Sequence, residues 1–385
     1  MKSPGEDIWD VCVIGGGPAG MMAAIRAAEL GAKVILIEKN PTLGKKLLIT
    51  GGGRCNVCNA EEDVRKLLSK FKGSDKFLFS AFSQWATKET LNFFHSHGME
   101  TKEEPLMRVF PVSNSAQSVW DVLVSDLKKY SVTVLSDSPA VGFTKEGGEI
   151  VSVLLKNKKE IRAKKFILAT GGKSRPETGS TGDGYEWLKD IGHSVTGTNA
   201  ALVPLMVTDA WVKKLAGVSV PEVKISVFQN DVKQDSRVGK LLFTHVGVSG
   251  PTILNMSRDI GELLKYGEVV LEIDFCPAFA YDTLNIKLQE IFAANDKKKL
   301  KNSLSDILPS AAVPVLLAEV DIDGETPCNS VTREVRLLLM KVLKHASMEV
   351  EKLQGMEKAV ITSGGVVLEE VDFKTMQCAF SQTSI

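Results

Sequence analysis

The sequence has no surplus of charge of either sign, because 47 Lys plus Arg balance 47 Asp plus Glu and the formal net charge is +0. A protein that binds nucleic acid or anionic membranes in a general way needs an excess of basic residues. Aromatic residues make up only 6% of the chain, which leaves little for stacking on bases. We therefore expect a small-molecule substrate, and neither a nucleic acid nor a membrane as a partner.

Long apolar runs are also missing: no stretch approaches the roughly 20 residues that a membrane-spanning helix needs. The uncharged stretch at 11–25 is interrupted by glycines and by Pro18. The N-terminus carries Glu6, Asp7 and Asp10, the wrong sign for a secretory leader. Six cysteines in 385 residues do not make a disulfide scaffold. These features predict a cytoplasmic protein of two or three domains.

A strand, a glycine-rich turn, a helix and a second strand follow one another near the N-terminus. Residues 9–14 (WDVCVI) and 33–38 (KVILIE) have the apolar, β-branched character of buried strands, and the helix former MMAAIRAAEL lies between them. This order predicts a parallel βαβ unit. The turn GGGPAG contains G-x-G-x-x-G, a pattern that binds the pyrophosphate of a dinucleotide at a helix N-terminus.

Each residue of this turn has an expected role. Gly15 permits the tight turn, Gly17 lets a pyrophosphate approach the backbone, and Gly20 lets the helix pack close to the sheet. Pro18 suits the first helical position. Glu38 ends the second strand at the spacing expected of the carboxylate that binds an adenosine ribose, and its charge disfavours a 2′-phosphate. The unit therefore predicts FAD or NAD rather than NADP.

Two further loops favour FAD over NAD. The segment GGGRCN at 51–56 exposes bare backbone that flat rings and phosphates can approach, and Lys46 and Arg54 supply positive charge beside it. The alternation over 132–170 predicts a meander of three strands that ends in Ala-Thr-Gly-Gly at 169–172. A strand that ends in this way after a meander is typical of flavoproteins with two dinucleotide folds.

The pattern of predicted strands and helices changes after Gly192, and strand-and-glycine segments like those of the first domain return near residue 357. Residues 195–275 contain short strand-like runs, which predict a mostly β domain. Residues 280–310 and 331–345 have helical patterns, and 357–368 return to strand-and-glycine character. A chain that leaves its first domain and later returns to it would give this order.

Six segments between residues 11 and 376 carry a specific resemblance: VIGGGPAGMMAA, LGKKLLITGGGRCNV, RVFPVS, ATGGKSRPETGSTGDGY, LLFTHVGVSGPTIL and AVITSGGVVLEEVDFKTM. In these segments the chain resembles a bacterial family of FAD flavoproteins that includes aminoacetone oxidase and bile-acid-dehydroxylation reductases. The resemblance implies an α/β fold, in which a β-barrel-like domain and a small helical domain are inserted into a Rossmann-like FAD-binding domain. The implied domains are the FAD-binding domain (1–194 and 357–385), the barrel (195–277 and 346–356) and the helical domain (278–345).

The resemblance also implies which residues contact the cofactor. The expected contacts to FAD are Gly15, Gly17, Pro18, Ala19, Gly20, Glu38, Lys39, Lys46, Gly53, Arg54, Cys55, Asn56, Val141, Thr170, Gly171, Gly172 and Asp183. Among them, Val141 would contact the adenine through its backbone. NAD(P)H would have to bind transiently over the flavin, because the sequence shows no separate fingerprint for it.

The sequence departs from the family's pattern at its C-terminus. Members continue with a strand, a Gly-Glu-x-x-Asp turn and a Gly-Gly-Tyr-Asn helix start, which hold the ribityl chain and the flavin pyrimidine. Here Met376 leads through Gln377 directly into CAFS at 378–381, which resembles the helix that follows that piece. We hypothesise that this flavin-binding segment and the final helix are lost, which predicts weak FAD binding or none.

A second departure is Cys58, which forms a C-x-x-C pair with Cys55. Such a pair can be a redox dithiol or half of a zinc site, and it can also be a coincidental substitution. Zinc needs a second pair, and Cys276, Cys328 and Cys378 are isolated in the sequence. We therefore expect no metal site.

Two residues are candidates for catalysis. Arg108, in RVFPVS, is a candidate contact for an anion or for the substrate, and the alternative is a salt-bridged structural arginine. His245, in FTHVGVSG, is a candidate proton donor near the flavin, and the alternative is a hydrogen-bonded structural histidine.

We expect an FAD-dependent oxidoreductase that acts on a small organic substrate, either by oxidising an amine or by reducing an enone-like acceptor with NAD(P)H. The alternatives are an NAD-dependent dehydrogenase, an RNA-modifying flavoprotein, and a catalytically impaired or FAD-free remnant of the family. The sequence predicts no oligomeric state.

Overall fold

The computed structural model describes residues 8–71 and 73–378 and divides the chain into two units. Unit 1 comprises Met1–Asn199 and Ser363–Ile385, and unit 2 comprises Ala200–Thr362. The chain thus leaves unit 1 and returns to it, as the change in sequence character suggests. The expected division into three domains stays a prediction.

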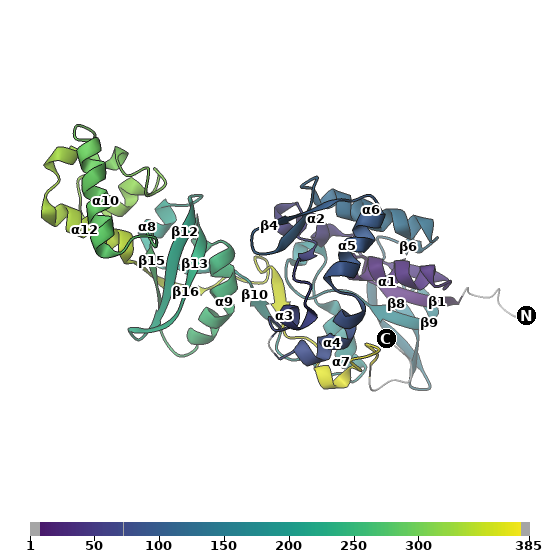
Figure 1. The fold of residues 1–385 in the computed structure, drawn as a ribbon. Coiled ribbons are helices and arrows are strands. Elements are labelled where there is room, and N and C mark those ends of the chain that lie inside the picture. The colour runs from purple at the N-terminus through teal and green to yellow at the C-terminus, as the bar shows by residue number, and fades with distance from the viewer. Residues whose placement is uncertain (1–7, 72, 379–385) are drawn as a thin grey trace, which may run out of the picture. The chain divides into compact units, whose positions relative to one another are not determined.

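Unit 1 is built on a sheet with the strand order β6-β2-β1-β9-β8-β7 (Figure 1). Its parallel strands are β1 (Trp9–Ile14), β2 (Val34–Ile37), β6 (Thr133–Leu135) and β9 (Glu160–Leu168). Two antiparallel strands, β7 (Ala140–Glu146) and β8 (Glu149–Leu155), complete the meander with β9. The predicted βαβ unit and meander are confirmed.

Helices cover both faces of this sheet because its central strands are apolar on both sides. On one face α1 (Pro18–Glu29) and α6 (Ala116–Lys129) pack with Val13 and Leu36. On the other face α7 (Asp183–Asp190) contributes Trp187, which packs with Cys12 and Phe166. Consecutive residues of β1 therefore belong to different cores, and the sheet has no solvated side at its centre.

Another part of unit 1 lies between β2 and α6 in the sequence. It contains a small sheet in the order β3-β5-β4, with Arg108 at the start of β5. The elements are α2 (Lys45–Ile49), the 3₁₀ turn η1 (Thr50–Gly52), β3 (Cys58–Asn59), α3 (Val64–Leu68), α4 (Asp75–Gln84), α5 (Thr87–Ser96), β4 (Thr101–Glu104) and β5 (Arg108–Pro111). Although residues 40–60 are rich in glycine and polar residues, KKLLI within them forms the short helix α2, whose Leu47 is buried.

Unit 2 contains a closed barrel with the strand order β11-β14-β13-β12-β15-β16. Helices pack against one core that is shared with the barrel, in which Val227 and Leu343 are both buried. The strands are β11 (Leu205–Val207), β12 (Ser219–Gln229), β13 (Val232–Thr244), β14 (Gly247–Ser249), β15 (Val269–Asp274) and β16 (Ala346–Leu353). The helices are α8 (Ala210–Lys214), α9 (Pro251–Leu263), α10 (Tyr281–Ala294), η3 (Leu300–Asn302), α11 (Val313–Ala318), η4 (Cys328–Ser330) and α12 (Arg333–Lys344).

The chain crosses between the units through the paired strands β10 (Asn199–Ala201) and β17 (Ile361–Ser363). Two short 3₁₀ turns of unit 1, η2 (Pro176–Thr178) and η5 (Leu368–Glu370), lie in the loop before α7 and in the C-terminal return. Of the segment CAFS at 378–381, which resembles a helix of the family, only Cys378 is described, and it forms an isolated bridge with Val371; residues 379–381 lie outside the described residues.

Candidate functional site

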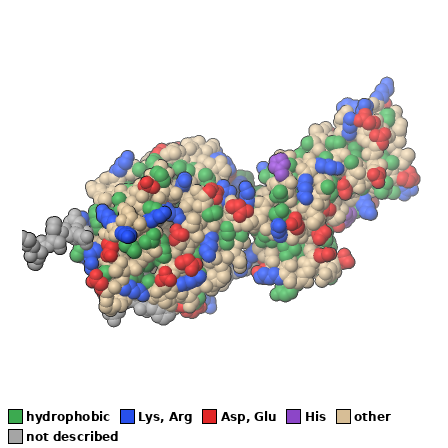
Figure 2. All heavy atoms as spheres, turned by 180° about the vertical axis from the view of Figure 1, so that it is seen from behind, with side chains coloured by type: hydrophobic (Ala, Val, Ile, Leu, Met, Phe, Trp, Pro, Cys, Tyr) green, Lys and Arg blue, Asp and Glu red, His purple; other side chains and the backbone are tan. Residues whose placement is uncertain are grey.

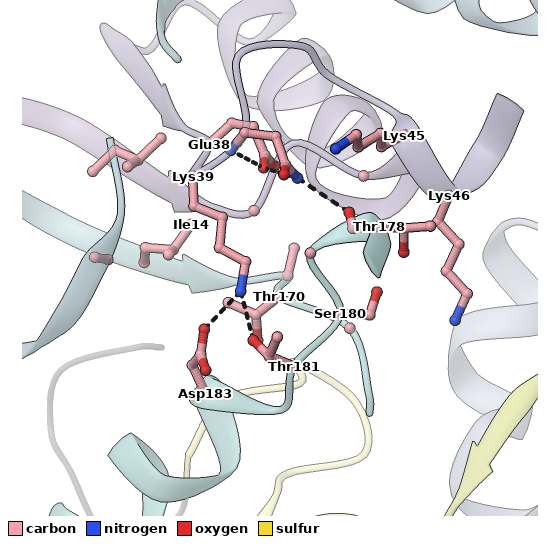
Figure 3. Close-up of a pocket in the computed structure, with 18 of the residues that line it drawn as sticks. Ile14, Glu38, Lys39, Lys45, Lys46, Thr170, Thr178, Ser180, Thr181 and Asp183 are labelled. Atoms are coloured by element: carbon pink, nitrogen blue, oxygen red, sulfur yellow. Dashed lines mark hydrogen bonds and ion pairs between the residues drawn. The ribbon is translucent and has the colours of Figure 1, made fainter. Parts of the chain in front are cut away.

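A cavity of about 320 Å³ lies at the carboxyl ends of the parallel strands of unit 1. Its lining comes from the ends of β1 and β2, the N-terminus of α1, residues 169–171 after β9, and the loop 178–183 that precedes and begins α7. Ligands of open α/β sheets bind at this edge, because it is where the loops and the helix N-termini meet. The cavity is therefore the candidate site (Figure 3).

Three glycines shape the edge of the cavity where β1 meets α1. A Cβ added to Gly15 would lie 2.4 Å from the carbonyl oxygen of Ala169, and one added to Gly20 would lie 1.8 Å from the carbonyl oxygen of Gly15. Both glycines are thus required for close packing. A Cβ on Gly17 would meet nothing within 4 Å, and Gly17 lines the cavity at the N-cap of α1. This open cradle at a helix N-terminus fits a pyrophosphate.

Glu38 follows β2 directly in the sequence and lines the cavity, and only 7% of its surface is exposed. Its Oε2 accepts a hydrogen bond from the Gly16 N–H at 2.7 Å, and its Oε1 accepts from the backbone and side-chain nitrogens of Asn40 at 2.7 and 2.8 Å. A carboxylate offers about four acceptor positions, so the three bonds leave capacity for one more donor. The arrangement fits a carboxylate that holds the turn and also receives a ribose hydroxyl.

The loop 173–183 is tied across the cavity by side chains from the other wall. The Lys39 amine donates to Thr181 Oγ1 at 2.5 Å and pairs with the Asp183 carboxylate at 2.8 Å (Figure 3). The Lys46 amine donates to Ser174 Oγ at 2.6 Å. Burial opposes the charge of Asp183, but hydrogen bonds from Lys39 and Thr181 outweigh it and hold the pKa of this carboxyl below its ordinary value. Burial, followed by the charge of a nearby arginine, lowers the pKa of Lys46.

The predicted positive charge at Arg54 is neutralised within the protein. Its guanidinium forms a two-pronged ion pair with Glu104, at 2.7 and 3.3 Å, and lies 4.1 Å from the centre of the Phe110 ring. Hydrogen bonds from Arg54 lower the pKa of Glu104. Arg108 lies on the same small sheet, 3.9 Å from Glu104, and donates to the carbonyl of Pro105 at 3.0 Å. Glu104 thus interacts with two arginines for which the sequence predicts separate roles.

The structure brings many of the predicted cofactor residues together. Those that line the cavity are Gly15, Gly17, Pro18, Ala19, Glu38, Lys39, Lys46, Thr170, Gly171 and Asp183. Those placed elsewhere are Gly20, Gly53, Arg54, Cys55, Asn56, Val141 and Gly172. Gly20 is buried behind the turn, and Val141 is 46% exposed on β7 while its neighbour Ala140 lines the cavity. Their contacts to a cofactor stay a prediction.

Several residues of the site are not among the predicted ones. Asn40 holds Glu38 and donates from Nδ2 to the carbonyl of Thr178 at 3.1 Å, while Ser174 and Thr181 receive the two lysines. The sequence offers a weak signal for Asn40, which lies two residues beyond the terminal acid of β2. It offers none for the two hydroxyls, because their partners are more than 120 residues away.

The remaining candidates are not among the residues that line the cavity. His245 is exposed in the turn between β13 and β14 of unit 2. Burial raises the pKa of Cys58 to about 11, and burial also raises the pKa of Cys55, so neither thiol has the depressed pKa of a reactive dithiol. Among residues 8–71 and 73–378, no cluster of three or more His, Cys, Asp or Glu has the geometry of a metal site. In the same residues, no helix is both long and apolar enough to span a membrane.

The fold and the cradle define a Rossmann-type FAD-binding protein. The chain belongs to the HI0933-like protein family, whose Rossmann-domain model matches residues 9–383. This family consists of FAD-dependent oxidoreductases, so the family-level prediction from the six sequence segments is confirmed.

Curated relatives cover nearly the whole chain. A ribosomal RNA dihydrouridine synthase of Escherichia coli is 31% identical over 96% of this chain and 88% of its own length. A 3-dehydro-bile acid delta(4,6)-reductase of Clostridium scindens is 28% identical over 96% of this chain and 89% of its own length. Among solved structures, a 3-ketosteroid-delta4-(5alpha)-dehydrogenase from Rhodococcus jostii aligns with a TM-score of 0.48 and 15% identity, covering 96% of this chain and 88% of that one.

Proposed function

We propose that this protein binds FAD in the cavity of unit 1 and uses it to reduce a carbon–carbon double bond that is conjugated to a carbonyl group. The observation that carries the cofactor assignment is the open cradle at Gly17, at the N-terminus of α1. A family of FAD-dependent oxidoreductases supports the same assignment. When bound, the flavin supplies the hydride chemistry, and the protein supplies position and electrostatics.

The residues of the cavity have distinct roles in this proposal. The free N–H groups of the first turn of α1 bind the pyrophosphate, helped by the positive end of the helix dipole. The Glu38 carboxylate accepts a hydrogen bond from a ribose hydroxyl at the acceptor position that its bonds to Gly16 and Asn40 do not use. Lys39 and Asp183 hold the loop 173–183 over the cavity through their ion pair, while Lys46 anchors the same loop at Ser174.

The names of two relatives support the substrate class. One makes dihydrouridine and the other is a delta(4,6)-reductase, and both names describe saturation of a double bond conjugated to a carbonyl. This favours reduction of an enone-like acceptor over oxidation of an amine. In the proposal NAD(P)H would bind transiently and supply the hydride that a bound flavin passes on, and Arg108 contacts an anionic part of the substrate.

The acceptor we propose is a small organic molecule. The net charge of +0 supports this choice, as does the face shown in Figure 2, on which basic and acidic side chains are interspersed. A uridine in RNA is the second candidate, because the 31% identical relative is a ribosomal RNA dihydrouridine synthase. Both candidates require the same conjugated double bond, so one assay can compare them.

The first experiment is the visible absorption spectrum of the purified protein, with the released cofactor identified by mass. We expect a flavin spectrum, with FAD as the released cofactor, once FAD has been added, because the lost C-terminal segment predicts weak binding. A colourless protein that takes up no added FAD would refute the proposal and favour the FAD-free remnant. Reduction of the bound flavin by NADH and by NADPH is then followed without oxygen.

The second experiment adds acceptors to the reduced flavin. We expect a small conjugated enone to reoxidise it, and a saturated ketone of the same skeleton to leave it reduced. Reoxidation by a ribosomal RNA transcript alone would favour the second candidate. Reduction of the oxidised flavin by small amines, without reoxidation by any enone, would replace the proposed reductase with an amine oxidase. Arg108→Gln should lower the rate of enone reduction while the FAD content stays unchanged.

A further inference from the structure

A chain of three interacting side chains lies in unit 1 and takes no part in lining the cavity: Glu370, His193 and Cys378. The Glu370 Oε2 atom is 2.9 Å from His193 Nδ1. On the other side of the imidazole ring, the Cys378 thiol makes a short contact with Nε2. The three residues come from η5, the segment after α7 and the end of the described chain, so only the fold brings them together.

The hydrogen bonds fix which ring nitrogen carries the proton. The backbone N–H of Ser194 donates to Glu370 Oε2 at 2.8 Å, and this bond is the main reason that the pKa of Glu370 lies below its ordinary value. An ionised carboxylate can only accept, so Nδ1 of His193 must donate to it. In the neutral ring Nε2 then carries the lone pair, and the Cys378 thiol donates to it. This order, carboxylate to imidazole to thiol, is the one that activates a cysteine nucleophile.

The three groups are also held in place. The His193 side chain is 2% exposed, so it is fixed by packing. The loop that presents Cys378 closes through a bridge between Val371 and Cys378, and through a hydrogen bond from the Asp372 N–H to the Gln377 carbonyl at 2.8 Å. Cys378 itself is half-buried rather than enclosed. A base that is buried and oriented beside an accessible thiol meets the geometric requirement for nucleophilic chemistry.

Other thiols of the chain have the opposite environment and serve as internal controls. Burial raises the pKa of Cys12 to about 12, that of Cys276 to about 12 and that of Cys58 to about 11. Such thiols are protonated at neutral pH and react slowly, because the thiolate is the nucleophile.

We propose that Cys378 is a nucleophilic thiol that exchanges with low-molecular-weight disulfides to form a mixed disulfide. His193 Nε2 takes the thiol proton, and the sulfur of Cys378 attacks one sulfur of the disulfide. The S–S bond of the small molecule breaks, a new S–S bond forms to Cys378, and the leaving thiolate takes the proton from His193. Cys378 is oxidised and the leaving sulfur is reduced, so the exchange needs no other oxidant. This inference does not depend on the proposed flavin reaction.

The test measures site-specific modification of the full-length protein by oxidised glutathione at neutral pH. Peptide mass mapping gives a rate for each cysteine. We expect Cys378 to react at least about 10-fold faster in the folded protein than in the same chain unfolded in urea. Cys58 should show the reverse, because folding raises its pKa. This comparison needs no variant, and equal or slower reaction of Cys378 in the folded protein would overturn the proposal.

Variants separate activation from mere packing. His193→Gln should slow the reaction of Cys378 about 10-fold or more. Glu370→Gln should slow the reaction less, because Glu370 orients the imidazole ring and does not accept the thiol proton. Cys378→Ser keeps a hydroxyl donor to His193 and should abolish modification while the melting temperature stays unchanged. Folding of each variant is read from protection of Cys12 and Cys276 against iodoacetamide. A folded His193→Gln protein that reacts at the wild-type rate would also overturn the proposal.

Discussion

Gly20 and Gly17 lie three residues apart in the same turn, and the structure predicts that substitution by alanine affects stability at Gly20 and FAD binding at Gly17. In Gly20→Ala the new Cβ would lie 1.8 Å from the Gly15 carbonyl oxygen, about 1.6 Å short of the ordinary contact distance of 3.4 Å. The obstructing atom is backbone, so α1 must shift away from β1. In Gly17→Ala the Cβ meets nothing within 4 Å and the backbone is already extended, with φ −75° and ψ 179°.

The magnitude follows from these contacts. Overpacking of a closely packed interior costs about 1–3 kcal/mol, and a rigid backbone obstruction belongs at the upper end. Replacing a glycine within a helix by alanine stabilises the helix by about 1 kcal/mol, because alanine has the higher helix propensity. We therefore expect Gly20→Ala to lower the free energy of unfolding by about 2 kcal/mol, which corresponds to roughly 4–8 °C in melting temperature for a domain of this size. For Gly17→Ala, the cost at the N-cap and the gain from a less flexible unfolded chain nearly cancel.

Two assays distinguish the variants. Thermal unfolding followed by circular dichroism should show the loss for Gly20→Ala alone. FAD titration by fluorescence should show about 10-fold or more weakening for Gly17→Ala, because its methyl group occupies the space proposed for the pyrophosphate. Equal melting temperatures for the two variants would refute the packing argument at Gly20. Unchanged FAD affinity in Gly17→Ala would refute the placement of the pyrophosphate.

Three further predictions concern the loop, the arginines and the C-x-x-C pair. Asp183→Asn should destabilise unit 1 by under about 1 kcal/mol at pH 7, because its ion pair with Lys39 is partly exposed. The difference in melting temperature between this variant and the wild type should shrink below pH 3.8. A carboxyl group whose pKa is lower in the folded protein than in the unfolded chain stabilises the fold at pH values above the unfolded-state pKa. This stabilisation is lost as the pH falls through the folded-state pKa. Arg54→Lys should cost about 1 kcal/mol in urea denaturation, and Arg108→Lys close to none. Cys58→Ser should retain the parent's FAD content by absorbance.

Each of these has an outcome that contradicts it. A difference between Asp183→Asn and wild type that persists undiminished at pH 2 would show that the ion pair is not its cause. Equal losses in Arg54→Lys and Arg108→Lys would show that the two-pronged contact to Glu104 has no special weight. Loss of flavin in Cys58→Ser would revive the redox interpretation of the pair.

Local patterns in the sequence predict the parts of the site that depend on neighbouring residues. The turn at Gly15–Gly20, the helix after it and the acid at Glu38 all follow from spacing, because a strand, a tight turn and a helix constrain residues close in the chain. The same holds for the meander over 132–170, whose strands follow from alternation between neighbouring residues. The resemblance of longer segments adds the family, which spacing alone does not give.

Pairings between distant residues are decided only in the folded protein. Lys39 and Asp183 are both predicted cofactor contacts, yet they bind each other across 144 residues of chain. Arg54 is predicted to place its charge at the cofactor, but Glu104 and Phe110 engage it instead. Charge and residue type indicate that such a group needs a partner, but not which of many partners the fold supplies.

The family, the dinucleotide turn and the order of the elements can therefore be predicted from the sequence, because they depend on short-range geometry and on long matching segments. Only the folded structure shows which loops cover the cavity, which charged side chains pair with one another and which thiol contacts an imidazole. His193 and Cys378 are 185 residues apart, and no periodicity or motif connects them. They meet because the chain returns to unit 1 after unit 2, and only the packing of that return places a thiol against a buried ring.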